Sequence, residues 1–180
     1  MIGFMEWTLN FIRNEGFSMK WLEERRVEWA PLLASRLRYF LDGYSFVFMC
    51  DKEREWFEKY FLQNINKKNK QRPIVPYFSL RALYPNLDSI KSVEDITLLE
   101  DMLDITFPNG YVYFYVGKTN SAQAQIAKNS EFGYLWVLDD NIPNSFYLNS
   151  KDESLDIKLL SLFKIFDASI DAVLSSKAQI

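Results

Sequence analysis

The first 43 residues carry apolar side chains at the spacing of two amphipathic helices. The first predicted helix ends at Gly16, because glycine commonly stops a helix. Its apolar residues recur every three or four positions: Phe4, Trp7, Phe11 and Ile12. Ser18 is a suitable N-cap for a longer helix that ends at Asp42-Gly43. Pro31 lies well inside this second helix, so we expect a kink or two abutting helices there.

Short apolar runs farther along the chain predict β-strands. The clearest are residues 44–50, 111–116 and 134–138, and a last short strand covers 146–148. The runs at 111–116 and 134–138 do not alternate with polar residues, which is typical of strands buried on both faces of a parallel sheet. A further strand at 74–78 is predicted at a sheet edge, because Pro73 and Pro76 cannot donate to a ladder.

Helical spacing separates these strands. It is found at residues 52–65, after Ser92, at 121–128 and at 154–175, whereas residues 79–89 are predicted to be irregular. Ser92 and Asp95 have the spacing of a capping box. Alternation of strands and helices predicts an open α/β sheet that is covered on both faces.

We therefore predict one α/β domain over residues 1–180. It contains N-terminal helices (1–43) arranged as a helical hairpin, an α/β core (44–150) and a C-terminal helix (151–180). The core is predicted to hold four or five parallel strands in a flavodoxin-like order, with helices on both faces.

Composition excludes several classes of enzyme. The chain has no histidine and one cysteine, which excludes Ser-His-Asp and Cys-His triads, histidine zinc motifs, internal disulfides and CxxC sites. Hydrophobic residues make up 48% of the chain, enough for a core, so overall disorder is excluded. The first residues do not resemble a signal peptide and no apolar run is long enough to span a membrane, so we expect a cytoplasmic protein.

The net charge of −3 argues against a dedicated nucleic-acid binder. The main basic cluster is Lys67, Lys68, Lys70 and Arg72, which we interpret as a solvated loop. Cys50 ends a predicted buried strand and is interpreted as a small core residue rather than a nucleophile.

The loops that follow the strands are where a doubly wound sheet binds ligands. Residues 51–55 (DKERE) lack glycine and are rich in carboxylates, and residues 117–121 (GKTNS) lack the spaced glycine of a phosphate loop. Asp139-Asp140 with Asp51 could form a metal site or an acid/base pair, but we favour turn and capping roles in which the carboxylates stay solvated. We therefore predict no catalytic residue, no cofactor and no metal.

The C-terminal helix has an apolar zone broader than one sheet face requires. We interpret the excess as a second burial against another chain, the alternative being a helix buried within the monomer. The candidate oligomer-interface residues are Leu155, Leu159, Leu160, Phe163, Phe166 and Leu174.

Several segments resemble the HobA family, and the resemblance runs essentially from end to end. They are residues 152–174 (DESLDIKLLSLFKIFDASIDAVL), 113–118 (YFYVGK), 54–66 (REWFEKYFLQNIN) and 132–138 (FGYLWVL), with the N-terminal helix around Trp7. The resemblance implies a relative of DiaA with a sugar-isomerase-type (SIS) α/β fold. It also implies a homotetramer that binds the N-terminal domain of the replication initiator DnaA.

Two functions follow from this resemblance. The first is a non-catalytic adaptor that gathers DnaA at the chromosomal origin without binding DNA or a membrane itself. The second is an SIS-type sugar-phosphate isomerase or ligand-sensing domain, which the acidic loop at residues 51–55 puts in doubt. Separately, the mix of Trp, Glu and Arg makes Trp21, Glu24, Arg25 and Glu28 candidate partner-binding residues. For Trp21, packing within the helical hairpin is the alternative.

Overall fold

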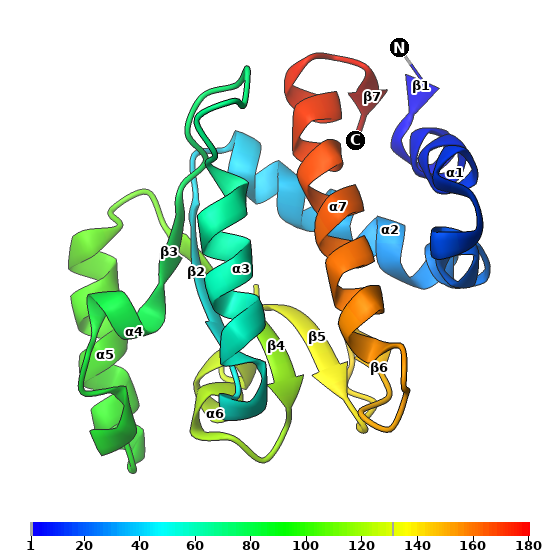
Figure 1. Cartoon of the computed structure of the whole chain (residues 1–180). Helices are drawn as coiled ribbons and strands as arrows, with labels where there is room; N and C mark the ends of the chain where they lie inside the picture. The colour runs from blue at the N-terminus through cyan, green and yellow to red at the C-terminus, as the bar shows by residue number, and fades with distance from the viewer. Residues whose placement is uncertain (1, 131) are drawn as a thin grey trace.

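The computed structural model describes residues 2–130 and 132–180 and contains a five-stranded parallel sheet (Figure 1). The strands are β2 (Ser45–Cys50), β3 (Tyr77–Ser79), β4 (Tyr111–Lys118), β5 (Tyr134–Leu138) and β6 (Ser145–Leu148). Their order in space is β3-β2-β4-β5-β6, and every neighbouring pair is parallel. This is the predicted flavodoxin-like order, with the topological switch point between β2 and β4.

Helices alternate with these strands, as the hydrophobic spacing predicts. They are α1 (Phe4–Glu15), α2 (Lys20–Leu41), α3 (Glu55–Ile65), α4 (Leu80–Leu83), α5 (Val93–Thr106), α6 (Ala122–Lys128) and α7 (Leu155–Leu174). Short 3₁₀ turns cover Gly16–Met19, Lys52–Arg54 and Leu87–Ser89. The capping box predicted at the start of α5 is confirmed, with reciprocal hydrogen bonds between Ser92 and Asp95.

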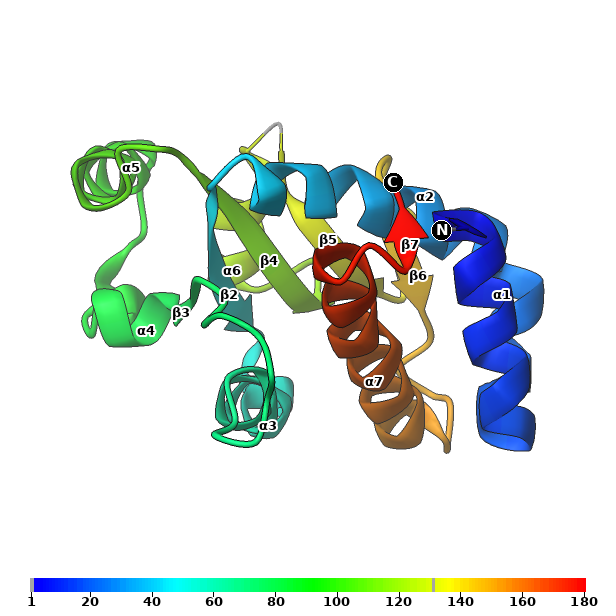
Figure 2. The ribbon, with the colours of Figure 1, turned by 90° about the horizontal axis from the view of Figure 1, so that it is seen from above.

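Each central strand is buried on both faces, and its alternate residues enter two different cores. On β2, Phe46 and Phe48 belong to a core that α1, α2, α3 and α7 complete. Val47 and Met49 belong to the opposite core, which α4, α5 and α6 complete (Figure 2). The alternation of side chains between the two faces of the sheet cannot be recognised in the sequence, because helices cover both faces and the residues on both are apolar.

The high aromatic content is used mainly inside the molecule. The Phe61 ring centroid lies 4.4 Å from that of Phe48, 5.5 Å from that of Phe114 and 5.5 Å from that of Phe166. The centroids of Phe114 and Trp136 are 5.0 Å apart. Edge-on and tilted aromatic contacts of this kind stabilise a core beyond the area that they bury.

The N-terminal helical hairpin differs from prediction in detail. Gly16 does end α1, with a φ of 70°, but Ser18 does not cap the next helix. Its hydroxyl donates back to the Glu15 carbonyl within a 3₁₀ turn, so α2 begins at Lys20 without a side-chain cap. The alternative of two abutting helices is wrong, since α2 continues through Pro31. The fully buried Trp29 and Leu33 on either side anchor this segment in the core.

Three smaller features complete the fold. The proline-flanked strand does lie at the sheet edge, as β3, although it begins at Tyr77 rather than at residue 74. The segment predicted to be irregular contains the short helix α4. The two ends of the chain lie side by side, because β1 (Ile2–Gly3) pairs in parallel with β7 (Ala178–Gln179) (Figure 1). These strands were not predicted, since two residues are too few to show a periodic pattern.

Candidate functional sites

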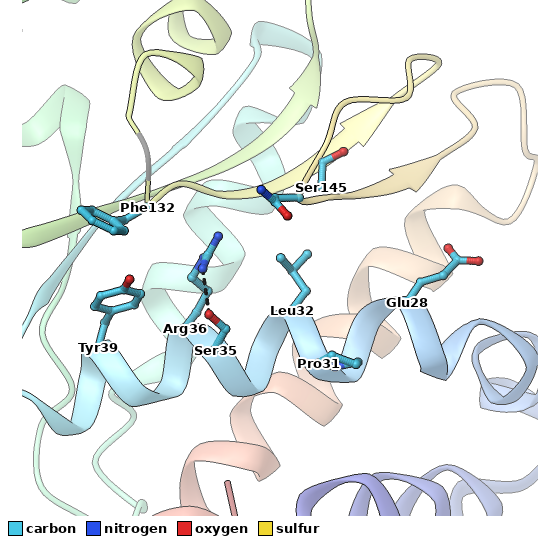
Figure 3. A pocket seen from close by; sticks show the side chains of 9 residues that line it. Glu28, Pro31, Leu32, Ser35, Arg36, Tyr39, Phe132 and Ser145 are labelled. Carbon is cyan, nitrogen blue, oxygen red and sulfur yellow. Dashed lines mark hydrogen bonds between the residues drawn. The ribbon is translucent and has the colours of Figure 1, made fainter.

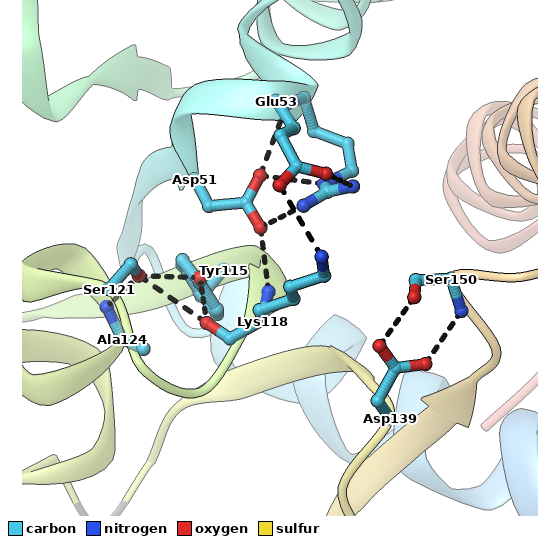
Figure 4. A network of polar contacts seen from close by, with 9 residues as sticks. Asp51, Glu53, Tyr115, Lys118, Ser121, Ala124, Asp139 and Ser150 are labelled. Carbon is cyan, nitrogen blue, oxygen red and sulfur yellow. Dashed lines mark hydrogen bonds and ion pairs between the residues drawn. The ribbon is translucent and has the colours of Figure 1, made fainter.

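At the switch point of the sheet, the chain places one of its own carboxylates (Figure 4). The Asp51 side chain follows β2 and caps the next 3₁₀ turn as predicted, but it is only 7% exposed, so the prediction that it stays solvated is wrong. It accepts hydrogen bonds from the backbone N–H of Lys118 at 2.7 Å and of Arg54 at 3.1 Å. It also accepts from Arg54 Nε at 2.6 Å and forms an ion pair with Arg54 Nη2. Four donors therefore converge where doubly wound sheets bind ligands.

The loop after β4 closes tightly over this carboxylate. Gly117 has a φ of 157°, and a Cβ at that position would lie 2.6 Å from Asp51 Cγ, so only glycine allows the approach. The Tyr115 hydroxyl donates to the Lys118 carbonyl at 2.5 Å and lies 2.7 Å from Ser121 Oγ. Burial raises the pKa of Tyr115, so its hydroxyl keeps its proton at neutral pH. A phosphosugar entering here would have to displace a buried, paired carboxylate.

The remaining strand-end acids have turn roles, as predicted. Asp139 accepts hydrogen bonds from Ser150 Oγ at 2.5 Å and Ser150 N at 2.7 Å, and these bonds lower its pKa. Asp140 accepts from Thr119 Oγ1 at 3.1 Å. Within residues 2–130 and 132–180, no group of three His, Cys, Asp or Glu side chains is placed to hold a metal ion. Cys50 is buried, which raises the pKa of its thiol, in agreement with a core role.

The basic loop is not simply solvated, and the prediction is wrong for half of it. Lys70 forms an ion pair with Asp167 of α7, and the Arg72 side chain is only 4% exposed. Arg72 contacts Asp167 at 2.6 Å and Asp171 at 2.7 Å. Lys70 and Arg72 therefore bind the loop to α7. The other two members of the predicted cluster, Lys67 and Lys68, are exposed.

The candidate partner-binding residues on α2 divide into packed and exposed side chains. Trp21 is half-buried, and Lys158 Nζ lies 5.0 Å from its ring centroid. Arg25 lies 4.2 Å over the Phe146 ring and donates to the Tyr147 carbonyl at 2.7 Å. The same guanidinium pairs with Glu28 at 2.8 Å. Among these four candidates the exposed side chains are those of Glu24 and Glu28, both of which are acidic.

A groove of about 610 Å³ continues this surface along α2 toward the loop before β5 (Figure 3). We call it the α2 groove. Its lining residues are Glu28, Pro31, Leu32, Ser35, Arg36, Tyr39, Phe132, Asn144 and Ser145. Arg36 is buried and donates twice to the Gly133 carbonyl, at 2.9 and 3.1 Å, which fixes one wall to the other. At one end of the groove, the ring centroids of Tyr39 and Phe132 lie 5.3 Å apart.

Sequence reasoning missed the α2 groove because its walls come from distant segments. Tyr39 lies on a helix and Phe132 in a loop, and neither position has a periodic or motif signal that links it to the other. Phe132 is 40% exposed, but the exposure of a single aromatic side chain cannot be derived from the sequence.

The candidate oligomer-interface residues on α7 also separate into two groups. Four of them are buried within the chain itself: Leu155, Leu159, Phe163 and Phe166. Leu160 is half-buried and Leu174 is 37% exposed. The second surface that α7 buries belongs to α1, to which Lys164 is tied by an ion pair with Glu15. The width of the apolar zone is thus largely explained inside the monomer.

Comparison with known proteins agrees with the fold and the sequence segments. The HobA family, described as a DNA replication regulator, matches residues 1–180. This chain belongs to the HobA family. The DNA replication regulator protein HobA of Helicobacter pylori is 31% identical to it over an alignment of 185 positions that covers 98% of each chain.

Two crystal structures from Helicobacter pylori share the fold of this HobA family member. One is HobA itself, with a TM-score of 0.79, 27% identity, and coverage of 100% of this chain and 99% of the other. The second is a complex of HobA with DnaA domain I-II, with a TM-score of 0.76, 29% identity and full coverage of both chains. In the parts of the chain that the structure describes, no helix has the length and apolarity to cross a membrane.

Proposed function

We propose that this chain binds the N-terminal region of DnaA and regulates replication initiation as a non-catalytic adaptor in the cytoplasm. The observation that carries the proposal is the full-length match to the HobA chain of a HobA–DnaA (domain I-II) complex. Family membership over residues 1–180 supports the same role. A partner-binding role also suits a chain without histidine, whose strand-end site is filled by Asp51.

We place the DnaA contact on the exposed side of α2 and the adjoining α2 groove. Glu24 and Glu28 supply charge, and Val27 between them is 63% exposed. Farther along the groove, Leu32 and Phe132 supply apolar surface around the buried Arg36. An apolar centre with a polar rim is the usual anatomy of a specific protein interface.

A homotetramer completes the proposal, because several DnaA molecules on one scaffold would be held at high effective concentration. The surface left for subunit contact on α7 includes Leu160, Leu174 and Ile157, which is 62% exposed. Leu160 and Ile157 border a hollow of about 310 Å³ between α7 and the turn that joins α1 to α2.

Calorimetric titration with a DnaA domain I-II fragment tests the binding and the α2 surface together. Val27→Glu should weaken binding at least tenfold, roughly 1.4 kcal/mol, by placing an unpaired charge in the contact. Ile105→Glu is the matched control, since Ile105 is another β-branched helix residue, on α5, and is 83% exposed. Absence of binding by the wild-type chain would refute the function, and equal binding by both variants would refute the α2 surface.

A further inference from the structure

We propose that the Asp51 carboxylate is a resident anion that fills the ligand site at the switch point, and that removing it opens a site for a small carboxylate, formate. The inference concerns which group occupies the donors at this site. It does not depend on DnaA binding.

The first support is the completeness of the cradle around Asp51. Two backbone N–H groups and two guanidinium nitrogens donate to its two oxygens, and the side chain is 7% exposed. The Lys118 N–H comes from the neighbouring strand β4, so the donors meet across the switch point rather than within one turn. Backbone donors at this place serve external anions in other doubly wound proteins.

The second support is Gly117. Its missing side chain leaves room for Asp51 rather than for an incoming molecule, because a Cβ there would lie 2.6 Å from both Asp51 Cγ and Oδ2. The close approach of backbone to anion, which glycine provides in nucleotide-binding loops, is here used for an internal carboxylate.

The third support is the buried positive charge of Arg54, which would lose its main partner if Asp51 were removed. The Arg54 side chain is also 7% exposed, and its remaining contact is with Glu53 at 2.9 Å. Without the Asp51 carboxylate, a buried guanidinium and the Lys118 N–H lose their partner, whereas the Arg54 N–H keeps the Asp51 backbone carbonyl at 3.1 Å. A buried cation and a buried donor left without a partner strongly destabilise a protein. The Tyr115–Ser121–Lys118 hydrogen bonds lie beside the vacated space and hold the loop in place.

The size of the vacated space makes the ligand specific. Asp51→Ala removes one carbon and two oxygens, which are the heavy atoms of formate, and retains Cβ. Acetate carries an additional methyl group that would meet this Cβ. Asp51→Gly removes Cβ as well and should accept acetate in addition to formate.

Thermal unfolding of the full chain in sodium formate, acetate, phosphate or chloride at matched ionic strength tests the inference. Asp51→Ala should melt about 10 °C below wild type. Formate should raise its Tm in a concentration-dependent manner that acetate and phosphate do not match. Wild type, and the control Asp140→Ala at a neighbouring strand-end loop, should show no formate-specific shift. Equal effects of formate and chloride on Asp51→Ala would overturn the proposal.

A second variant covers the case in which Asp51→Ala does not fold in any of these salts. Asp51→Asn keeps the shape of the side chain, removes its charge and leaves no room for formate. It should melt below wild type and show no formate-specific recovery. A melting temperature equal to that of wild type would mean that the site does not require an anion and would overturn the proposal.

Discussion

Arg72 shows how one buried cation can be mistaken for a surface charge. It lies in the most basic stretch of the sequence, yet its guanidinium is nearly covered and contacts Asp167, Asp171 and the Ile65 carbonyl. The same side chain therefore links the end of α3 to α7. A charge run in a sequence does not reveal which of its members are paired, because the acidic partners lie almost a hundred residues away.

Replacing Arg72 should cost far more stability than replacing its neighbours. Arg72→Ala leaves Asp167, 13% exposed, with a lysine partner alone and leaves the Ile65 carbonyl without its donor. We expect a loss of about 3 kcal/mol, in the range found when one partner of a buried pair is removed. Lys67→Ala, at an exposed position in the same loop, should change stability by less than about 0.5 kcal/mol. Urea unfolding of the two variants measures the difference, and equal stabilities would contradict this role of Arg72.

Most strands of the sheet and most of the helices that cover it could be predicted from the sequence. These elements depend on patterns within a few residues, which can be recognised without knowing the fold. Examples are the continuous apolar run of β4 and the capping box of Ser92 and Asp95. The internal role of Asp51 could not be predicted, because it depends on the register that brings Lys118 to β2. The α2 groove and the α1 cover of α7 were missed for the same reason: both are contacts between distant segments.

The start of α7 should make stability depend on pH in the acid range. Hydrogen bonds from Lys158 and from Ser154 lower the pKa of Asp152 to about 2, below the value of about 3.9 for an unfolded aspartate. A depressed pKa stabilises the fold above the unfolded value, and this contribution is lost as pH falls from about 4 to about 2.

Asp152→Asn should remove that acid-dependent contribution. Because the carboxylate is 25% exposed and partly screened, we expect a loss of about 1 kcal/mol at pH 7, with the wild-type and variant curves converging near pH 2. Asp156→Asn on the exposed side of the same turn is the control. Chemical unfolding between pH 2 and pH 7 gives both curves, and a constant separation at every pH would show that Asp152 acts through something other than its charge.

Considered over the whole molecule, the number of free, clustered cations distinguishes an adaptor from a DNA-binding protein. The chain carries a net charge of −3, and ion pairs with α7 occupy two of the four cations in its main basic cluster. A protein that neutralises several phosphates needs several free, clustered cations. We therefore expect no binding to origin DNA by this chain alone, and an increase in the amount of DnaA that the origin retains, because gathered initiators occupy neighbouring sites at high effective concentration.

This mechanism predicts that stimulation of DnaA depends on assembly of the adaptor. Leu160→Glu places a charge at a half-buried position of α7 and should break the proposed tetramer while leaving the α2 surface intact. Leu98→Glu is the control, since Leu98 is 68% exposed on α5. Light scattering should show smaller particles for Leu160→Glu alone, with circular dichroism confirming that it is folded.

Loading of DnaA on origin DNA, measured with both variants, then separates two mechanisms. The Leu160→Glu chain should still bind one DnaA domain I-II fragment, with the affinity of a single site, yet lose the stimulation of loading that wild type and Leu98→Glu provide. Loading equal to wild type by a dissociated Leu160→Glu chain would mean that each bound DnaA is altered individually. Multivalent presentation would then give way to a conformational effect on DnaA, since an adaptor with one site cannot raise the local concentration of a second initiator.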